Sequence, residues 1–163
     1  MMQLEPIVSA QAEELSAFAH PIWMEVFGPM LPGGNREAAY FADNWQSPAA
    51  IRQQMNEGLS YFYFQIDGQH AGYCAARPEG VSLFVSKLYL LPAYRGRGLG
   101  TAMIGQVLDW GKKQDLRRAY LHVNVHNARA IKVYRHNGFQ VQEHVVTKVG
   151  EYDADDYVMV RTI

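Results

Sequence analysis

Residues 95–101, RGRGLGT, place three glycines and two arginines between an apolar run and an amphipathic segment. Glycine permits conformations in which successive backbone N–H groups turn toward one point, and a helix that begins there adds a positive field. The two arginines add mobile positive charge. This chemistry suits an anion, most often a phosphate group. The residues that we expect to contact it are Arg95, Gly96, Arg97, Gly98, Leu99, Gly100 and Thr101.

Two familiar phosphate loops fit this stretch poorly. A P-loop for metal-bound nucleotides requires G-x4-G-K-[ST], and the lysine is absent here. A dinucleotide fingerprint requires G-x-G-x-x-G, but Thr101 takes the third glycine position and the loop lies past the middle of the chain. Glycines that merely let a helix pack closely are the plain alternative.

A third interpretation uses Arg95-x-x-Gly98-x-Gly100 together with residues 127–139, NARAIKVYRHNGF, which lie one strand further on. This second stretch matches N-x-x-A-x-x-x-Y-x-x-x-G-F. In order and spacing the two motifs resemble the signatures of the GCN5-related N-acetyltransferase (GNAT) family. The resemblance covers about residues 60–160. It implies acetyl-CoA as co-substrate, with its pyrophosphate on the glycine loop, and no metal.

Acetyl transfer from a thioester to an amine needs a neutral amine, a donor for the developing oxyanion and a proton for the departing thiolate. The resemblance implies that Tyr134 is the general acid, beside the CoA sulfur. It also implies that the main chain of Leu88, Tyr89 and Leu90 binds the pantetheine arm, with the Leu90 N–H as oxyanion donor. Asn127 is expected to contact the cofactor, to cap its helix, or both.

The residues leave the general base open. Relatives often carry a carboxylate near residue 86, where this chain has Ser86 and Lys87. The alternatives are His122, Tyr89, Glu25, Glu37 and a water chain. His122 and His126 share one face of a predicted strand, but two imidazoles without a third ligand make a poor zinc site.

We expect the acceptor cleft at the N-terminal helices and the last strands. Aromatic and acidic side chains there suit a cationic amine: Trp23, Phe27, Tyr40, Phe41, Trp45, Glu25, Glu37 and Asp43. A looser similarity to the polyamine (PaiA-like, spermidine/spermine) acetyltransferases rests on IWMEVFGPML, EAAYFADNWQSPAAIRQQM and DADDYVMV. It favours a polyamine or diamine as the small-molecule acceptor.

Other acceptors and other classes of protein stay open. A protein N-terminus or lysine, an amino sugar or an antibiotic amine would suit the same chemistry. A non-catalytic acyl-CoA sensor and a structural dimer module are the rivals. Tyr134 argues against a sensor, because a binding protein needs no acid beside the sulfur.

Composition narrows the setting. Residues 95–135 hold nine basic and two acidic residues, whereas the rest holds six and fourteen, so the middle of the chain suits an anionic ligand. No basic run indicates nucleic acid, and no apolar run or leader indicates a membrane or export. The single cysteine, Cys74, is typical of a reducing compartment, so we expect a cytoplasmic protein. Relatives often pair through their last strands, which makes a homodimer a further expectation.

The elements that must position these residues alternate between strands and helices. We predict strands at residues 3–8, 61–66, 69–76, 81–91, 119–125, 139–149 and 157–162, with a hairpin turn at Asp67-Gly68. Helices are predicted from Ser9 through Leu15, Phe18 and Ile22, with Pro21 expected to kink or end this helix, and from Ser47 to Gly58, from Leu99 to Lys113 and from Asn127 to Gly138. The stretch EYDADD is expected to be a solvated turn. The order β-α-α-β-β-β-α-β-α-β-β predicts an α/β (α+β mixed sheet) GNAT acyl-CoA N-acyltransferase fold, with residues 1–163 as a single N-acetyltransferase domain.

Overall fold

A computed structural model describes all residues, 1–163, and its centre is one seven-stranded sheet in the order β1-β2-β3-β4-β5-β7-β6. Only β4 and β5 pair in parallel. The strands are β1 (Met2–Ile7), β2 (Ser60–Ile66), β3 (Gln69–Glu79), β4 (Ser82–Leu90), β5 (Arg118–Asn124), β6 (Gln140–Val149) and β7 (Tyr152–Thr162). The helices are α1 (Ala12–Phe27), α2 (Gly34–Trp45), α3 (Pro48–Asn56), α4 (Leu99–Lys112) and α5 (Ala128–His136), with short 3-10 turns η1 (Ser9–Gln11) and η2 (Pro92–Tyr94). The mixed α/β class is as predicted.

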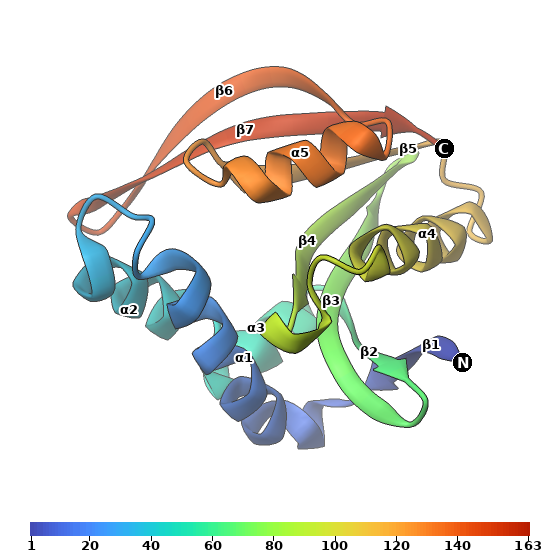
Figure 1. Cartoon of the computed structure of the whole chain (residues 1–163), viewed down its shortest axis with the longest axis horizontal. Coiled ribbons are helices and arrows are strands. Elements are labelled where there is room, and N and C mark those ends of the chain that lie inside the picture. Colours follow the sequence, from blue (N-terminus) through green and yellow to red (C-terminus); the bar gives the residue numbers. More distant parts are fainter.

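Alternating side chains of the strands supply two cores, one on each face of the sheet. On β2, Phe62 and Phe64 join the core beneath α4 and α5, whereas Tyr61 and Tyr63 join the core beneath α1 and α3. A third cluster joins α1 to α2 and to Ala154 of β7. Helices therefore cover both faces, with α1–α3 on one side and α4 and α5 on the other (Figure 1).

Several local predictions are confirmed. The chain turns between β2 and β3 at residues 67–68, as the Asp-Gly pair indicates. The Ser47 hydroxyl accepts a hydrogen bond from the Ala50 N–H at 3.2 Å and begins α3. Asn127 caps α5 in the same way, since its side-chain oxygen accepts from the Ala130 N–H at 3.2 Å. No helix of the structure has the length and apolar character needed to cross a membrane.

The prediction of two helices after the first strand is wrong, because α2 makes a third. Its buried residues are Glu37, Ala38, Phe41 and Ala42, which recur at helical spacing. That pattern was present in the sequence. The glycines and prolines that precede it are typical of a loop and hid the start of the helix.

The predicted limits of the first helix are also wrong. Ser9 opens the turn η1, and α1 begins only at Ala12. Pro21 lies inside α1, which continues to Phe27. Proline removes one backbone hydrogen bond, but Ile22 and Trp23 directly after it are buried, and packing of this face outweighs the local penalty.

The predicted turn EYDADD is wrong as well. Residues 152–156 form the first half of β7 and pair antiparallel with β6. Asp153 and Asp155 lie on one face of the strand, whereas Asp156 shares the other face with the buried Ala154 and Val158. The strand thus begins five residues earlier than predicted, and this shift places Asp156 in the sheet.

Candidate functional site

The parallel pair at the centre of the sheet is interrupted. Residues 82–85 of β4 pair with residues 118–121 of β5, and beyond them the two strands are no longer partners. The register between β3 and β4 shifts at the same level, between Ala75 and Ala76, which marks a bulge in the sheet. β4 diverges from β5 along its second half (Figure 1). The divergence leaves an opening between the two strands.

Main-chain groups of β4 face this opening. The Leu91 N–H donates to the Ala71 carbonyl on the β3 side, at 2.8 Å. Successive amides of a strand point to opposite sides, so the amides of Leu90 and Leu88 point away from β3 and toward the opening. The Leu90 carbonyl, on the same side, accepts hydrogen bonds from Nε and Nη2 of Arg95 at 3.1 and 3.0 Å.

A cleft of about 700 Å³ occupies the opening and extends to the glycine loop. The predicted residues that line it are Leu88, Tyr89, Leu90, Arg95, Gly96, Gly98, Gly100, Thr101, Asn127 and Tyr134. Arg97 and Leu99 do not line it. Arg97 instead lies over the ring of Tyr94, 5.7 Å from its centre, and Leu99 packs on the core. The structure thus brings together most of the two sequence motifs, which lie about 30 residues apart.

The glycine loop has a conformation that its sequence explains. Gly96 and Gly98 have φ of 75° and 74°, in the left-handed region that favours glycine, and Gly98 is the N-cap of α4. A side chain built on either residue would meet no atom within 4 Å. The loop is therefore open where the first N–H groups of α4 emerge, which fits an anion at this helix end.

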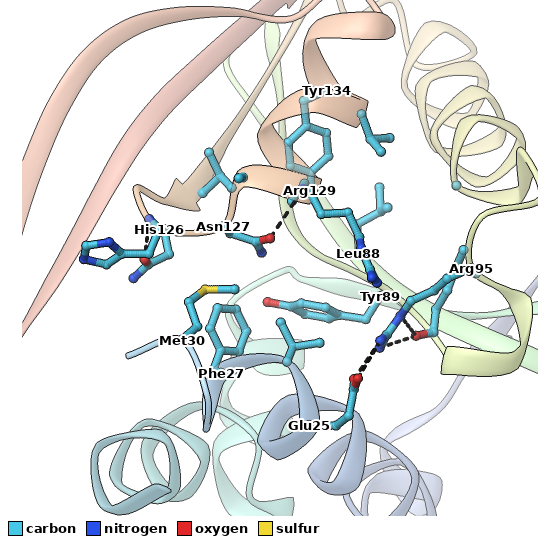
Figure 2. A pocket seen from close by; sticks show the side chains of 18 of the residues that line it. Glu25, Phe27, Met30, Leu88, Tyr89, Arg95, His126, Asn127, Arg129 and Tyr134 are labelled. Carbon is cyan, nitrogen blue, oxygen red and sulfur yellow. Dashed lines mark hydrogen bonds and ion pairs between the residues drawn. The ribbon is translucent and has the colours of Figure 1, made fainter. Parts of the chain in front are cut away.

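Arg95 joins this loop to α1. Its Nη1 lies 2.7 Å from Glu25 Oε2, and both side chains line the cleft. Figure 2 shows this ion pair on the α1 side, with Tyr89 beside it. Glu25 is therefore a partner of Arg95 and not a free carboxylate. No sequence pattern joined these two residues, which are 70 positions apart.

Tyr134 enters the cleft from α5, on the side opposite α1 (Figure 2). Burial raises the pKa of its hydroxyl to about 12. Its ring packs edge-on against Phe139, with 5.9 Å between centroids. Asn127, the cap of α5, lines the same wall, so the cap and a cofactor contact are compatible. A hydroxyl with this pKa stays protonated near neutral pH and is able to donate its proton.

A second pocket of about 350 Å³ lies beside the cleft. The two share Phe27, Tyr89, His122 and Asn124, so they meet at the opening of the sheet. The remaining wall of the second pocket comes from α1, α2, α3, the segments that connect them to each other and to β2, and the strands β3, β4, β6 and β7. We name it the acceptor pocket; it holds four of the predicted aromatic residues, Trp23, Phe27, Phe41 and Trp45.

The carboxylate of the acceptor pocket is Asp156, which sequence reasoning missed. Its Oδ2 lies 3.9 Å from Nδ1 of His122, and its backbone pairs with Asn124 of β5. Burial raises the pKa of the Asp156 carboxyl above its usual range. The signal was its place between Ala154 and Val158 at every second position of a strand, but the run of acids around it is typical of a turn.

The acidic residues that we expected in the acceptor pocket lie elsewhere. Glu25 lines the cofactor side, paired with Arg95. Glu37 is buried and accepts a hydrogen bond from the Gly33 N–H at 3.1 Å, at the start of α2. Asp43 and Tyr40 line neither cavity. Of the proposed bases, His122 and Tyr89 lie where the two cavities meet. Burial raises the pKa of the Tyr89 hydroxyl far above neutrality, so Tyr89 is protonated and does not serve as a base.

The fold defines a mixed α/β protein with a cleft through an interrupted sheet. Residues 23–139 match the model of the Acetyltransferase (GNAT) family, and the chain belongs to that family. An uncharacterized N-acetyltransferase of Mycobacterium tuberculosis is 37% identical over 102 residues, 60% of this chain and 63% of that protein. Another from Methanocaldococcus jannaschii is 30% identical over 90 residues, 51% of this chain and 40% of that protein. The chain therefore spans less than two thirds of these curated relatives.

Solved structures share the fold at low identity. The PaiA N-acetyltransferase of Thermoplasma acidophilum, in complex with coenzyme A, has a TM-score of 0.80 at 17% identity. The match covers 100% of this chain and 99% of that one. The ribosomal-protein-S18-alanine N-acetyltransferase of Escherichia coli has a TM-score of 0.67 at 19% identity, covering 100% and 94%. These matches establish the GNAT fold of this chain.

Proposed function

We propose that this protein is an N-acetyltransferase that moves the acetyl group of acetyl-CoA to a small primary amine by direct attack within a ternary complex. The observation that carries the proposal is the junction of the two cavities. The cofactor cleft, with its glycine loop, meets the acceptor pocket, with its carboxylate, at the opening between β4 and β5. Acetyl-CoA supplies an activated thioester carbonyl.

The cofactor cleft fits that co-substrate on chemical grounds. The open glycine loop and Arg95 present N–H groups and positive charge to a diphosphate. The amides of Leu88 and Leu90 offer hydrogen bonds to the arm and to the developing oxyanion. The side chains of Arg97 and Leu99 do not line the cleft, and we assign these two residues a role through the backbone that shapes the anion site.

On the acceptor side, Asp156 holds the incoming ammonium, and His122 receives one of its protons directly or through water. His122 is preferred because it lines both cavities, whereas Glu25 and Glu37 are held by other partners. The amine nitrogen then forms the bond to the acetyl carbon as the carbon–sulfur bond breaks. Tyr134 donates its proton to the departing sulfur, and the second proton that the nitrogen loses passes through water to the tyrosinate and restores it.

A first experiment separates an enzyme from a non-catalytic acyl-CoA sensor. Purified protein is mixed with acetyl-CoA and a panel of amines, and free thiol is measured over time. Amine-dependent thiol release supports the transferase. Tight binding of acetyl-CoA in calorimetry without release with any amine would favour the sensor, and no heat with CoA or acetyl-CoA would refute both.

The loose sequence similarity to the polyamine branch favours a polyamine acceptor, whereas the cationic side chains Lys87 and Arg77 that line the acceptor pocket oppose one. A peptide N-terminus, an amino sugar and an antibiotic amine are the other acceptors for the panel. The fold alone does not choose among them, because related folds serve many substrates.

A further inference from the structure

Six of the 19 residues that line the acceptor pocket are Phe, Trp or Tyr. Phe41 and Trp45 stack with 4.8 Å between centroids and 3° between planes, and Trp23 meets Trp45 edge-on at 6.0 Å. The indole N–H of Trp23 is used inside the protein, since it donates to the Ala38 carbonyl at 2.9 Å. The rings therefore offer mostly apolar surface to a ligand. Pockets of this kind favour apolar bodies with a few fixed polar contacts.

The acceptor pocket has one acidic lining residue, Asp156. It faces His122, which belongs to the wall shared with the cofactor cleft. Burial of the carboxylate favours a cationic partner, because an unpaired charge in an apolar site is costly. An ammonium bound by Asp156 would therefore lie at the end of the pocket that opens toward Tyr134.

The acceptor pocket also has two cationic lining residues, Lys87 and Arg77. Lys87 is 6% exposed, and its ammonium donates to the Trp45 carbonyl at 2.7 Å, to Gln54 Oε1 at 2.9 Å and to the Tyr61 hydroxyl. All three of its N–H groups are thus occupied, so it supplies charge but no free donor. Burial lowers the pKa of this ammonium to about 7, so its charge repels a second cation below neutral pH and is largely lost by about pH 8.

Arg77 is the second cation of this wall. It is paired with Glu79 at 2.7 Å, which offsets part of its charge. The remaining polar groups are neutral, and among them the buried Gln46 has an Nε2 without a partner. A second ammonium on a substrate would thus meet Lys87 and Arg77 with no carboxylate to bind it.

Resting on the proposed acetyl transfer, we propose that the acceptor is a primary amine with a single positive charge and an apolar, preferably aromatic, body. The amine binds Asp156 at the junction of the cavities, and the body lies among the rings of α1 and α2. Lys87 and Arg77 reject diamines and polyamines. The pocket is therefore selective for monoamines.

The test compares acceptors that differ in one charge. Pentylamine and 1,5-diaminopentane have the same chain, and 2-phenylethylamine and spermidine represent the two classes. At about pH 6, where Lys87 is charged, we expect kcat/KM from thiol release to be at least about tenfold higher for pentylamine than for 1,5-diaminopentane, because a second ammonium is repelled. The highest value is expected for 2-phenylethylamine.

Two variants test the source of the selectivity. Lys87→Gln and Arg77→Gln should each narrow the difference between pentylamine and 1,5-diaminopentane, whereas Lys113→Gln, on the exposed end of α4, should leave it unchanged. Lys87 also holds α2 to β4 through Trp45, so thermal melting checks that its variant folds. If that variant does not fold, Arg77→Gln alone decides.

The outcomes separate the two proposals. If 1,5-diaminopentane or spermidine is turned over as fast as pentylamine or faster, monoamine selectivity is overturned and the proposed acetyl transfer stands. A preference for phenylalanine or for a short peptide with a free N-terminus would have the same two consequences. If none of the amines gives thiol release, the transferase is refuted. The selectivity among amines would then be measured as their binding affinity in calorimetry. Weaker binding of pentylamine than of 1,5-diaminopentane would overturn monoamine selectivity in that case too.

Discussion

Nδ1 of His122 and Oδ2 of Asp156 lie 3.9 Å apart across the β5–β7 pair, where the two cavities of the protein meet. In the proposed mechanism the imidazole accepts a proton and the carboxylate holds the ammonium of the acceptor. Because the sheet is open on its β4 side at this level, both side chains lie beside the path between acceptor and cofactor. Several measurable consequences follow from this junction and from the motifs around it.

Asp156→Asn should raise KM for the amine by about ten- to a hundredfold, because a charge-assisted contact is lost. In the unaltered protein, burial raises the pKa of Asp156, so amine binding should weaken as pH falls through a value above that of an ordinary aspartate. The variant should lack this acidic limb in its profile of KM against pH. Asp153→Asn, on an exposed part of β7, serves as the control. An unchanged acidic limb in Asp156→Asn would remove Asp156 from acceptor binding.

Tyr134→Phe should lower turnover by about one to three decades and leave the affinity for acetyl-CoA nearly intact, because only the proton donor is removed. Its pKa of about 12 means that Tyr134 itself adds no loss of activity between pH 6 and 9. Thiol release and calorimetry on the same samples give the two quantities. An unaltered rate would show that the thiolate leaves without this acid.

Gly98→Val should weaken acetyl-CoA binding by about tenfold or more, since a branched side chain would occupy the open mouth of α4 and strain a left-handed backbone. Gly105→Ala is the matched control, because Gly105 lies within the same helix, has open space around it and does not have a positive φ. The control should bind the cofactor normally and gain slightly in stability. Equal affinities for both variants would contradict an anion site at this loop.

Lys87 should make stability depend on pH. Burial lowers its pKa to about 7, whereas in the unfolded chain it has its ordinary high value. Between those values the unfolded chain holds one more proton, so the free energy of unfolding should rise with pH, by up to about 1.4 kcal/mol per unit. Urea unfolding of the wild type and of Lys87→Gln from pH 7 to 9 tests this. Parallel curves for the two proteins would contradict it.

Glu25→Gln should change kcat by less than about threefold, because Glu25 is already paired with Arg95 and partly exposed pairs of this kind contribute little. His122→Gln is the comparison. We expect this variant to lose about two decades of kcat, because it removes the proposed general base. Loss of two decades in Glu25→Gln, with His122→Gln near normal, would exchange their roles.

Much of the cofactor side could be predicted because its determinants are local. The glycine loop and α5 each depend on residues that are neighbours in sequence, where a positive φ at Gly98 or a cap at Asn127 follows from residue type. The direction of the Arg97 side chain could not be predicted, since it turns onto Tyr94 and does not line the cleft. Side-chain direction in a loop is decided by what packs nearby.

The sequence by itself determined the family, the alternation of strands and helices, the anion loop and the position of Tyr134 on its helix. Only the tertiary structure decided where β4 leaves β5, that Arg95 meets Glu25, and that Asp156 lies in the acceptor pocket beneath α1 and α2. The physical reason is the distance along the sequence over which each kind of interaction acts. Local backbone preferences act over a few residues, whereas strand pairing, burial and charge compensation depend on partners 30 to 70 positions away.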